Sequence, residues 1–166
     1  MLRALIGSLV LSLGACANPG HDARLLPGQS SGTDVLARYG TPVQRWREAD
    51  GGQTLEYSSQ PFGRTCWMIK LDANDRLISI EDTLRYASRF SIEAGMTAEQ
   101  VSRRLGRERS RVFFPLSGED VWDWNVEPDQ SGYLLRFNVH FKEGRVARTS
   151  QSMVVPERFP SFFGRD

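Results

Sequence analysis

The sequence has few of the residues from which metal and redox sites are built. It holds two cysteines and two histidines among 166 residues, and the histidines, His21 and His140, stand far apart. A protein zinc site usually takes three or four Cys and His ligands, so these residues cannot assemble one on their own. No glycine-rich phosphate-binding loop is present either. We therefore expect neither a metal nor another cofactor.

The chain also lacks an excess of charge of either sign. It has 21 basic and 20 acidic residues. Residues 1–15 contain one basic residue, Arg3, so the chain after residue 15 has 21 − 1 = 20 basic residues against 20 acidic ones. There is no dense basic cluster, so we expect no nucleic-acid partner. About 150 residues remain after residue 15, enough to bury the core of one domain or of two small ones.

An apolar run stands near the N-terminus, and it is short. Residues 1–15 read MLRALIGSLVLSLGA, with a positive charge at Arg3, apolar residues from Ala4 onward, and small residues at the end. This order is typical of an export signal. A membrane-spanning helix needs about 20 apolar residues. We therefore expect residues 1–15 to be a removed signal peptide.

The signal ends in four residues, Leu13, Gly14, Ala15 and Cys16, that resemble the lipobox of bacterial lipoproteins. The resemblance implies that acyl chains are attached to the Cys16 thiol and that the chain is cut before it. More than one acyl chain makes membrane anchoring stable. Ala17 follows the cysteine, which implies sorting to the outer membrane, facing the periplasm. The alternative is an ordinary secretory signal with a chance cysteine.

An acylated Cys16 leaves Cys66 without a partner in the chain. We expect Cys66 to be a small buried apolar residue within the apolar run RTCWMIKL. Pairing between two chains is the alternative.

Residues 27–42 and 94–108 echo one another. Each stretch has a Gly, then Ser or Thr, a short helical pattern, and a closing glycine, Gly40 or Gly106. A glycine is the usual residue just past the end of a helix. Helices of two to three turns are marginal alone, so both must pack on something else.

Four strand patterns follow each predicted helix. Apolar and polar residues alternate in them, which is typical of half-buried antiparallel strands. We therefore expect an α+β fold of two tandem units, each a short helix packed on a 3–4-stranded antiparallel sheet. The expected strands lie around 43–46, 54–58, 65–71, 76–80, 111–114, 121–126, 133–141 and 145–149.

The same patterns divide the chain into five parts. They are a signal peptide at 1–15, a lipidated N-terminus and tether at 16–27, a first unit at 28–86, a second unit at 87–150, and a tail rich in Pro and Phe at 151–166.

The repeated pattern resembles the BamE (SmpA/OmlA) family of small outer-membrane lipoproteins. The usual family member carries one such unit, and the same half-unit occurs in tandem in the β-lactamase-inhibitor-protein fold. The resemblance implies a protein-binding role in the envelope, with the β-barrel assembly machinery among the partners. It rests in the second copy on Gly95, Thr97, Val101, Leu105, Gly106, Trp124, Phe137, Phe141, Gly144 and Val146.

Residues able to act as catalysts are few. Residues 28–32, GQSSG, match the G-x-S-x-G motif of serine hydrolases. That motif needs a buried strand directly before it, and the only apolar residues directly before it here are Leu25 and Leu26, followed by Pro27. We expect Ser30 to start a helix instead. Asp120 and its acidic neighbours are predicted to lie in a loop leading into a strand. Residues 72–76, DANDR, are predicted to form a hairpin turn.

Aromatic side chains are the remaining functional signal, because Trp and Tyr dominate protein interfaces. We expect a non-enzymatic, lipid-anchored protein-binding module, with an envelope protein as partner and no small-molecule substrate. The alternatives are a periplasmic inhibitor or modulator of an envelope enzyme, and a small hydrolase using Ser30 or a carboxylate. The candidate partner-binding residues are Trp46, Phe62, Trp122, Phe159, Phe162 and Phe163.

Overall fold

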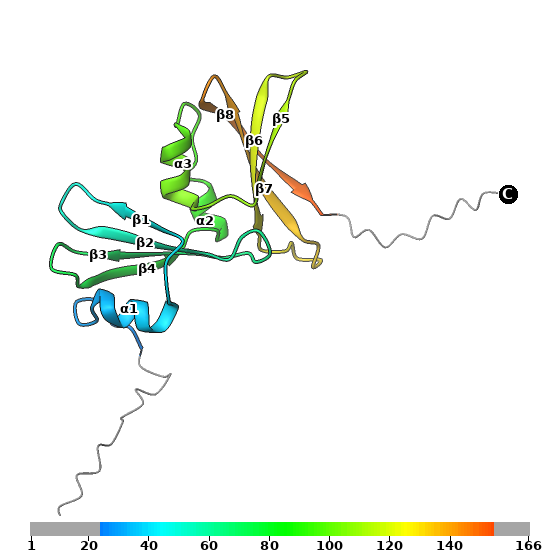
Figure 1. Cartoon of the computed structure of the whole chain (residues 1–166). Coiled ribbons are helices and arrows are strands. Elements are labelled where there is room, and N and C mark those ends of the chain that lie inside the picture. The colour runs from blue at the N-terminus through cyan, green and yellow to red at the C-terminus, as the bar shows by residue number, and fades with distance from the viewer. Residues whose placement is uncertain (1–23, 155–166) are drawn as a thin grey trace, which may run out of the picture.

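The computed structural model describes residues 24–154, which fold into two antiparallel sheets and the helices that cover them (Figure 1). Each sheet has four strands that follow one another in chain order. The fold is therefore α+β with two tandem units, as the sequence predicts. The elements are α1 (Gly32–Tyr39), β1 (Gln44–Arg47), β2 (Gln53–Ser58), β3 (Cys66–Leu71), β4 (Leu77–Asp82), α2 (Tyr86–Arg89), α3 (Ala98–Leu105), β5 (Ser110–Phe114), β6 (Glu119–Val126), β7 (Leu135–Lys142) and β8 (Arg145–Met153).

Both longer helices begin with a capping box. Ser31 Oγ accepts from the backbone N–H of Asp34, and the Asp34 carboxylate accepts from the N–H of Ser31. Thr97 and Gln100 repeat the arrangement at α3. Each box satisfies two backbone donors that a helix otherwise leaves unpaired. The predicted role of Ser30 is wrong by one residue, because the hydroxyl that caps α1 belongs to Ser31.

The first sheet packs one face against α1. Val35 of α1 lies against apolar side chains that alternate along the strands, and Tyr57 and Trp67 close the edge of this core. The fully buried members are Val35, Leu55, Ile69, Leu71 and Leu77.

Helix α3 contacts both sheets. Its Val101 and Leu105 belong to a core that holds Trp124 and Val139 of the second sheet and also Met68 of the first. Figure 1 shows the resulting order of layers: α1, the first sheet, α3, and the second sheet. The two units therefore share a core. The sequence alone did not decide whether they form one domain or two.

Hydrogen bonds between the units reinforce the shared core. The Glu56 carboxylate accepts from the backbone N–H of Arg107 at 2.6 Å. The Gln60 side chain makes two hydrogen bonds with the backbone of Asn125, at 2.9 and 3.2 Å. The Asn125 side chain donates in return to Pro61 O at 2.7 Å. Backbone groups of one unit are thus satisfied by side chains of the other.

Cys66 lies in this junction, fully buried. Burial raises the pKa of its thiol to about 12. A thiol that stays protonated is a poor nucleophile, so Cys66 acts as a small apolar core residue, as expected.

The edges of the two units differ slightly from the predicted divisions. Leu25 packs on the first core, so the folded part begins before residue 28. Strand β8 continues to Met153, three residues past the predicted end of the second unit at 150. Cys16 and the tail aromatics Phe159, Phe162 and Phe163 lie outside the described residues, as do the lipobox positions 13–15.

The closing glycines of the two helices offer a matched test of the junction. Gly40 and Gly106 have nearly the same positive φ, 76° and 75°. A Cβ on Gly40 meets nothing within 4 Å, whereas one on Gly106 would overlap Cys66 Sγ. We expect Gly40→Ala to cost about 1–3 kcal/mol from backbone strain. Gly106→Ala should cost a further 1–3 kcal/mol or so from overpacking. Urea unfolding measures both, and equal losses would contradict the shared core.

The buried Glu56 predicts a pH dependence of stability. Burial is the largest cause that raises its pKa, opposed by the hydrogen bonds from Arg107 and Trp46. A carboxyl whose pKa is raised on folding contributes stability below its unfolded pKa, and this contribution is lost as pH rises through the folded value. As pH rises above about 4, the ordinary pKa of a glutamate carboxyl, the free energy of unfolding of the wild type should therefore fall relative to that of Glu56→Gln. Denaturant unfolding of both proteins along this range checks the sign, and a constant difference would refute it.

Candidate functional site

A chain of polar side chains crosses the face of the second sheet that is turned away from α3, here termed the open face. His140 of β7 lies at its centre and is largely buried. Its Nδ1 is 3.0 Å from Glu119 Oε2, and its Nε2 is 2.8 Å from Ser150 Oγ. The alternation of residues in the sequence placed His140 on the polar side of its strand. It could not predict that Glu119 and Ser150 are neighbours of His140, because the pairing of the strands determines those contacts.

Charged partners complete the open face. The Arg148 guanidinium donates to both oxygens of Glu119, at 3.2 and 2.8 Å. The hydrogen bond from Arg148, followed by that from His140, lowers the pKa of Glu119. At the other end, Asp123 pairs with Arg109 and accepts from Ser110. Glu119 and Asp120, which the sequence assigned to a loop, therefore lie in strand β6, and both accept hydrogen bonds.

The order Ser150, His140 and Glu119 is the order of groups in an acyl-transfer triad. In such triads the histidine takes the serine proton, and the carboxylate orients the ring. Here Asn138 Nδ2 also lies 3.3 Å from Ser150 Oγ and 3.2 Å from Ser152 Oγ. The arrangement thus places a base, His140, next to the Ser150 hydroxyl. The same hydrogen bonds also have a structural use, because they pair polar side chains on a sheet face that no helix within residues 24–154 covers.

The hairpin that joins β5 and β6, residues 110–119, carries exposed apolar side chains. Phe113 is 61% exposed, Phe114 is 49% exposed, and Val112 is 46% exposed. Leu116, in the turn, is fully exposed. Neighbouring side chains of a strand point to opposite faces, so Phe113 and Phe114 extend to both sides of the hairpin. An apolar group of this kind on a surface is typical of an interaction site.

Three of the predicted partner-binding aromatics are described by the structure, and they differ in exposure. Phe62, in the β2–β3 loop, is 97% exposed. Trp46 is half-buried at the junction, where its Nε1 donates to Glu56 and the Arg103 guanidinium lies 4.9 Å from its ring. The prediction for Trp122 is wrong: it is 6% exposed, because it faces α3. The exposed residues of the β5–β6 hairpin were missed, although the unbroken apolar run Val112 to Leu116 was a signal for them.

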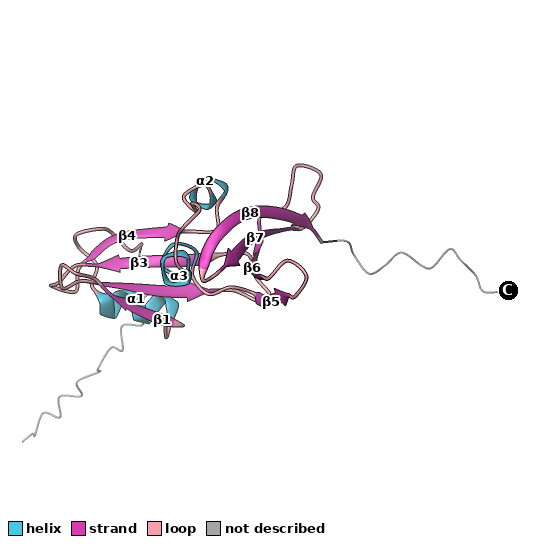
Figure 2. Cartoon of the chain, turned by 90° about the horizontal axis from the view of Figure 1, so that it is seen from above, coloured by secondary structure: helices cyan, strands magenta, loops and turns pink. Residues whose placement is uncertain are grey.

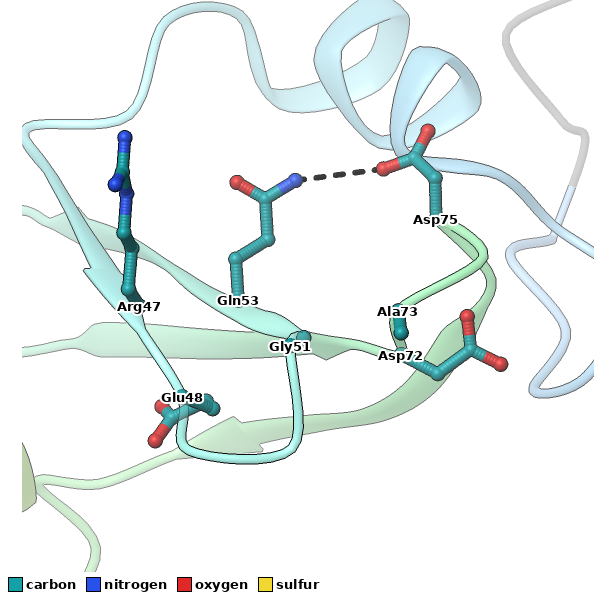
Figure 3. Close-up of a pocket in the computed structure, with 8 residues that line it drawn as sticks. Arg47, Glu48, Gly51, Gln53, Asp72, Ala73 and Asp75 are labelled. Atoms are coloured by element: carbon teal, nitrogen blue, oxygen red, sulfur yellow. Dashed lines mark hydrogen bonds between the residues drawn. The ribbon is translucent and has the colours of Figure 1, made fainter.

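A polar cavity of about 380 Å³ lies at the end of the first sheet where the turns between β1 and β2 and between β3 and β4 are found (Figure 3). The Asp72 and Asp75 carboxylates in its lining accept hydrogen bonds from backbone N–H groups. Asp72 Oδ1 accepts from the N–H groups of Asn74 and Arg76, both at 2.8 Å, and Asp75 Oδ2 accepts from Gly32 N–H. The stretch 72–76 is therefore a hairpin turn, as predicted. The cavity is lined by Arg47, Glu48, Gly51, Gly52, Gln53, Asp72, Ala73 and Asp75.

Comparison with known proteins adds little. No protein-family model matches the chain, and no curated protein matches it. Among solved structures, it is similar to a DUF4309 family protein, YjgB, from Bacillus subtilis subsp. subtilis str. 168. That match has 14% sequence identity and a TM-score of 0.29, and it covers 80% of this chain and 84% of the other. A likeness this low carries no argument. Within residues 24–154, none of the helices is long and apolar enough to cross a membrane.

Proposed function

We propose that this chain is a lipid-anchored, periplasm-facing outer-membrane protein that binds another envelope protein through the β5–β6 hairpin. The observation that carries the proposal is the group of exposed apolar side chains at Val112, Phe113, Phe114 and Leu116. The lipobox ending at Cys16 supports the anchor, and the tandem helix-on-sheet units support a BamE-like module.

The position of the hairpin suits this role. The described chain begins beside α1, and the β5–β6 hairpin lies at the opposite end of the molecule in both views (Figures 1 and 2). An anchor on the N-terminal side would therefore leave the hairpin free to meet a partner. A second copy of the helix-on-sheet unit also enlarges the surface beyond that of a single unit, which suits an assembly protein or, as the alternative, an inhibitor that docks on an enzyme.

Site-specific photocrosslinking in intact envelopes tests the proposed contact. A photoreactive phenylalanine analogue replaces Phe113 or Leu116, and in the control it replaces Ile78, a 43% exposed residue of the first sheet. Because these side chains are exposed, the changes should alter the free energy of unfolding by less than about 0.5 kcal/mol. We expect one discrete crosslinked product from the hairpin positions and none from position 78. Equal products from all three positions would contradict the proposal.

The same experiment with Cys16→Ser tests the anchor. Loss of the acylated thiol should move the protein from the membrane fraction to the soluble fraction. The hairpin crosslink to a membrane-resident partner should then fall, because the anchored chain benefits from a high effective concentration beside its partner. Unchanged partitioning would remove the anchor from the proposal while leaving the hairpin contact to stand on its own result.

A serine hydrolase is the second candidate function, favoured by the hydrogen bonds that link Ser150, His140 and Glu119. A fluorophosphonate probe reacts with activated serines, so it separates the two candidates. A hydrolase predicts labelling of the wild type that is lost in Ser150→Ala and kept in Ser30→Ala. The protein-binding proposal predicts no labelling of any of the three. Mass spectrometry of the labelled peptide identifies the serine.

A further inference from the structure

A second cavity, of about 390 Å³, lies between the α2 segment and the side of the second sheet that faces the core. Apart from Ser150, whose hydroxyl bonds to His140 on the open face, its lining residues belong neither to the open face nor to the β5–β6 hairpin. Strand pairing places Gln151 opposite Phe137 and Thr149 opposite Val139, so all four share the face turned toward the α2 segment. The cavity is lined by Tyr86, Arg89, Phe90, Ile92, Phe137, Thr149, Ser150 and Gln151.

Arg89 is the unusual member of this lining. It is 6% exposed, and its Nε and Nη1 atoms are buried without a hydrogen-bond partner. The Tyr86 ring lies 5.4 Å from the guanidinium carbon. The charge of Glu127 also acts on Arg89, although the ion pairs of residues 24–154 do not include this pair. Burial lowers the pKa of Arg89. A buried guanidinium without a partner is costly, and an anion that accepts its hydrogen bonds would remove that cost.

The walls around Arg89 suit an apolar group. Tyr86 and Phe90 pack edge to face with their centroids 4.7 Å apart, yet they remain 60% and 69% exposed. Phe137 is 5% exposed. Thr149 and Gln151 add a hydroxyl and an amide on strand β8. Three of the eight lining residues are aromatic, and Ile92 adds a fourth apolar side chain. Apolar side chains together with a few polar groups are the usual lining of a small-molecule site.

We infer that this cavity, here termed the Arg89 pocket, binds a small organic monocarboxylate whose apolar body lies against Tyr86, Phe90 and Phe137. A guanidinium presents two parallel N–H groups that match the two oxygens of a carboxylate. The pocket offers one cation, on which the negative charge of Glu127 already acts, so a dianion such as phosphate would bring a second charge without a partner. The site lies outside the proposed protein-binding surface and is independent of it.

The probe for this site is 4-phenylbutyrate, and its neutral control is 4-phenylbutanol. The protein is the full chain with Cys16→Ser, which leaves every described residue unchanged. Titration followed by two-dimensional amide NMR should show saturable shifts at residues of the pocket with the carboxylate. Arg89→Met should weaken binding about 10- to 100-fold, the loss expected for a charged hydrogen-bonded pair. Arg85→Gln, an exposed arginine four residues away, should bind as the wild type does.

Three results would overturn the inference. They are no saturable shifts in the wild type, binding of the alcohol as tight as that of the carboxylate, and binding by Arg89→Met as tight as that of the wild type. Tighter binding of inorganic phosphate than of 4-phenylbutyrate would overturn the choice of a monocarboxylate. Arg89→Met should unfold at the same temperature as the wild type or higher, because it removes a buried charge without a partner. If that variant fails to fold, the comparison of acid and alcohol in the wild type still decides.

Discussion

The arrangement of the whole molecule depends on one buried carboxylate. Glu56 is 1% exposed and lies on the face of the first sheet that is turned toward α3. It accepts from Arg107 N–H, just past the end of α3, and from Trp46 Nε1 at 3.1 Å. These two hydrogen bonds oppose, without cancelling, the effect of burial, which raises the pKa of the Glu56 carboxyl. They hold the end of α3 against the first sheet, and this contact lets one helix cover two sheets.

Because α3 packs between the two sheets, it covers one face of the second sheet and leaves the other face without a helix from the described chain. The face toward α3 is apolar, with Trp124 and Val139 fully buried. Among residues 24–154 no helix covers the open face. Several of its polar side chains bond to one another, as His140 does between Glu119 and Ser150, although Arg136 Nε is buried without a partner. A hydrogen-bonded polar face needs no cover, so the second sheet is stable with one side in water. Such bonding accounts neither for the apolar β5–β6 hairpin nor for the buried Arg136 Nε.

Sequence periodicity predicted the elements well because alternation depends on local geometry. Leu55 and Tyr57, and likewise Trp122 and Trp124, face the helices as the alternation requires. The layer order was beyond the same reasoning. Helix α3 buries Val101 and Leu105 among charged residues, which predicts one apolar stripe against one sheet. The same stripe also contacts Cys66 and Met68 of the first sheet, and Gly106 and Glu56 complete that contact. The hydrophobic pattern of α3 alone does not report this second contact. Trp122 was misassigned for the same reason, because exposure depends on which face is covered.

The two units have therefore diverged in what they leave unsatisfied. The first unit has α1 on one face and α3 on the other, and its carboxylates at residues 72 and 75 serve turns and caps. The second unit holds an exposed apolar hairpin and buried guanidinium nitrogens of Arg89 and Arg136 without hydrogen-bond partners. In the first unit, Phe62 of the β2–β3 loop is an exposed aromatic side chain that stands apart. Departures from local consistency concentrate at functional sites. Both proposed binding surfaces, the β5–β6 hairpin and the Arg89 pocket, therefore lie in or beside the second unit, and in these proposals the first unit is the support that fixes α3.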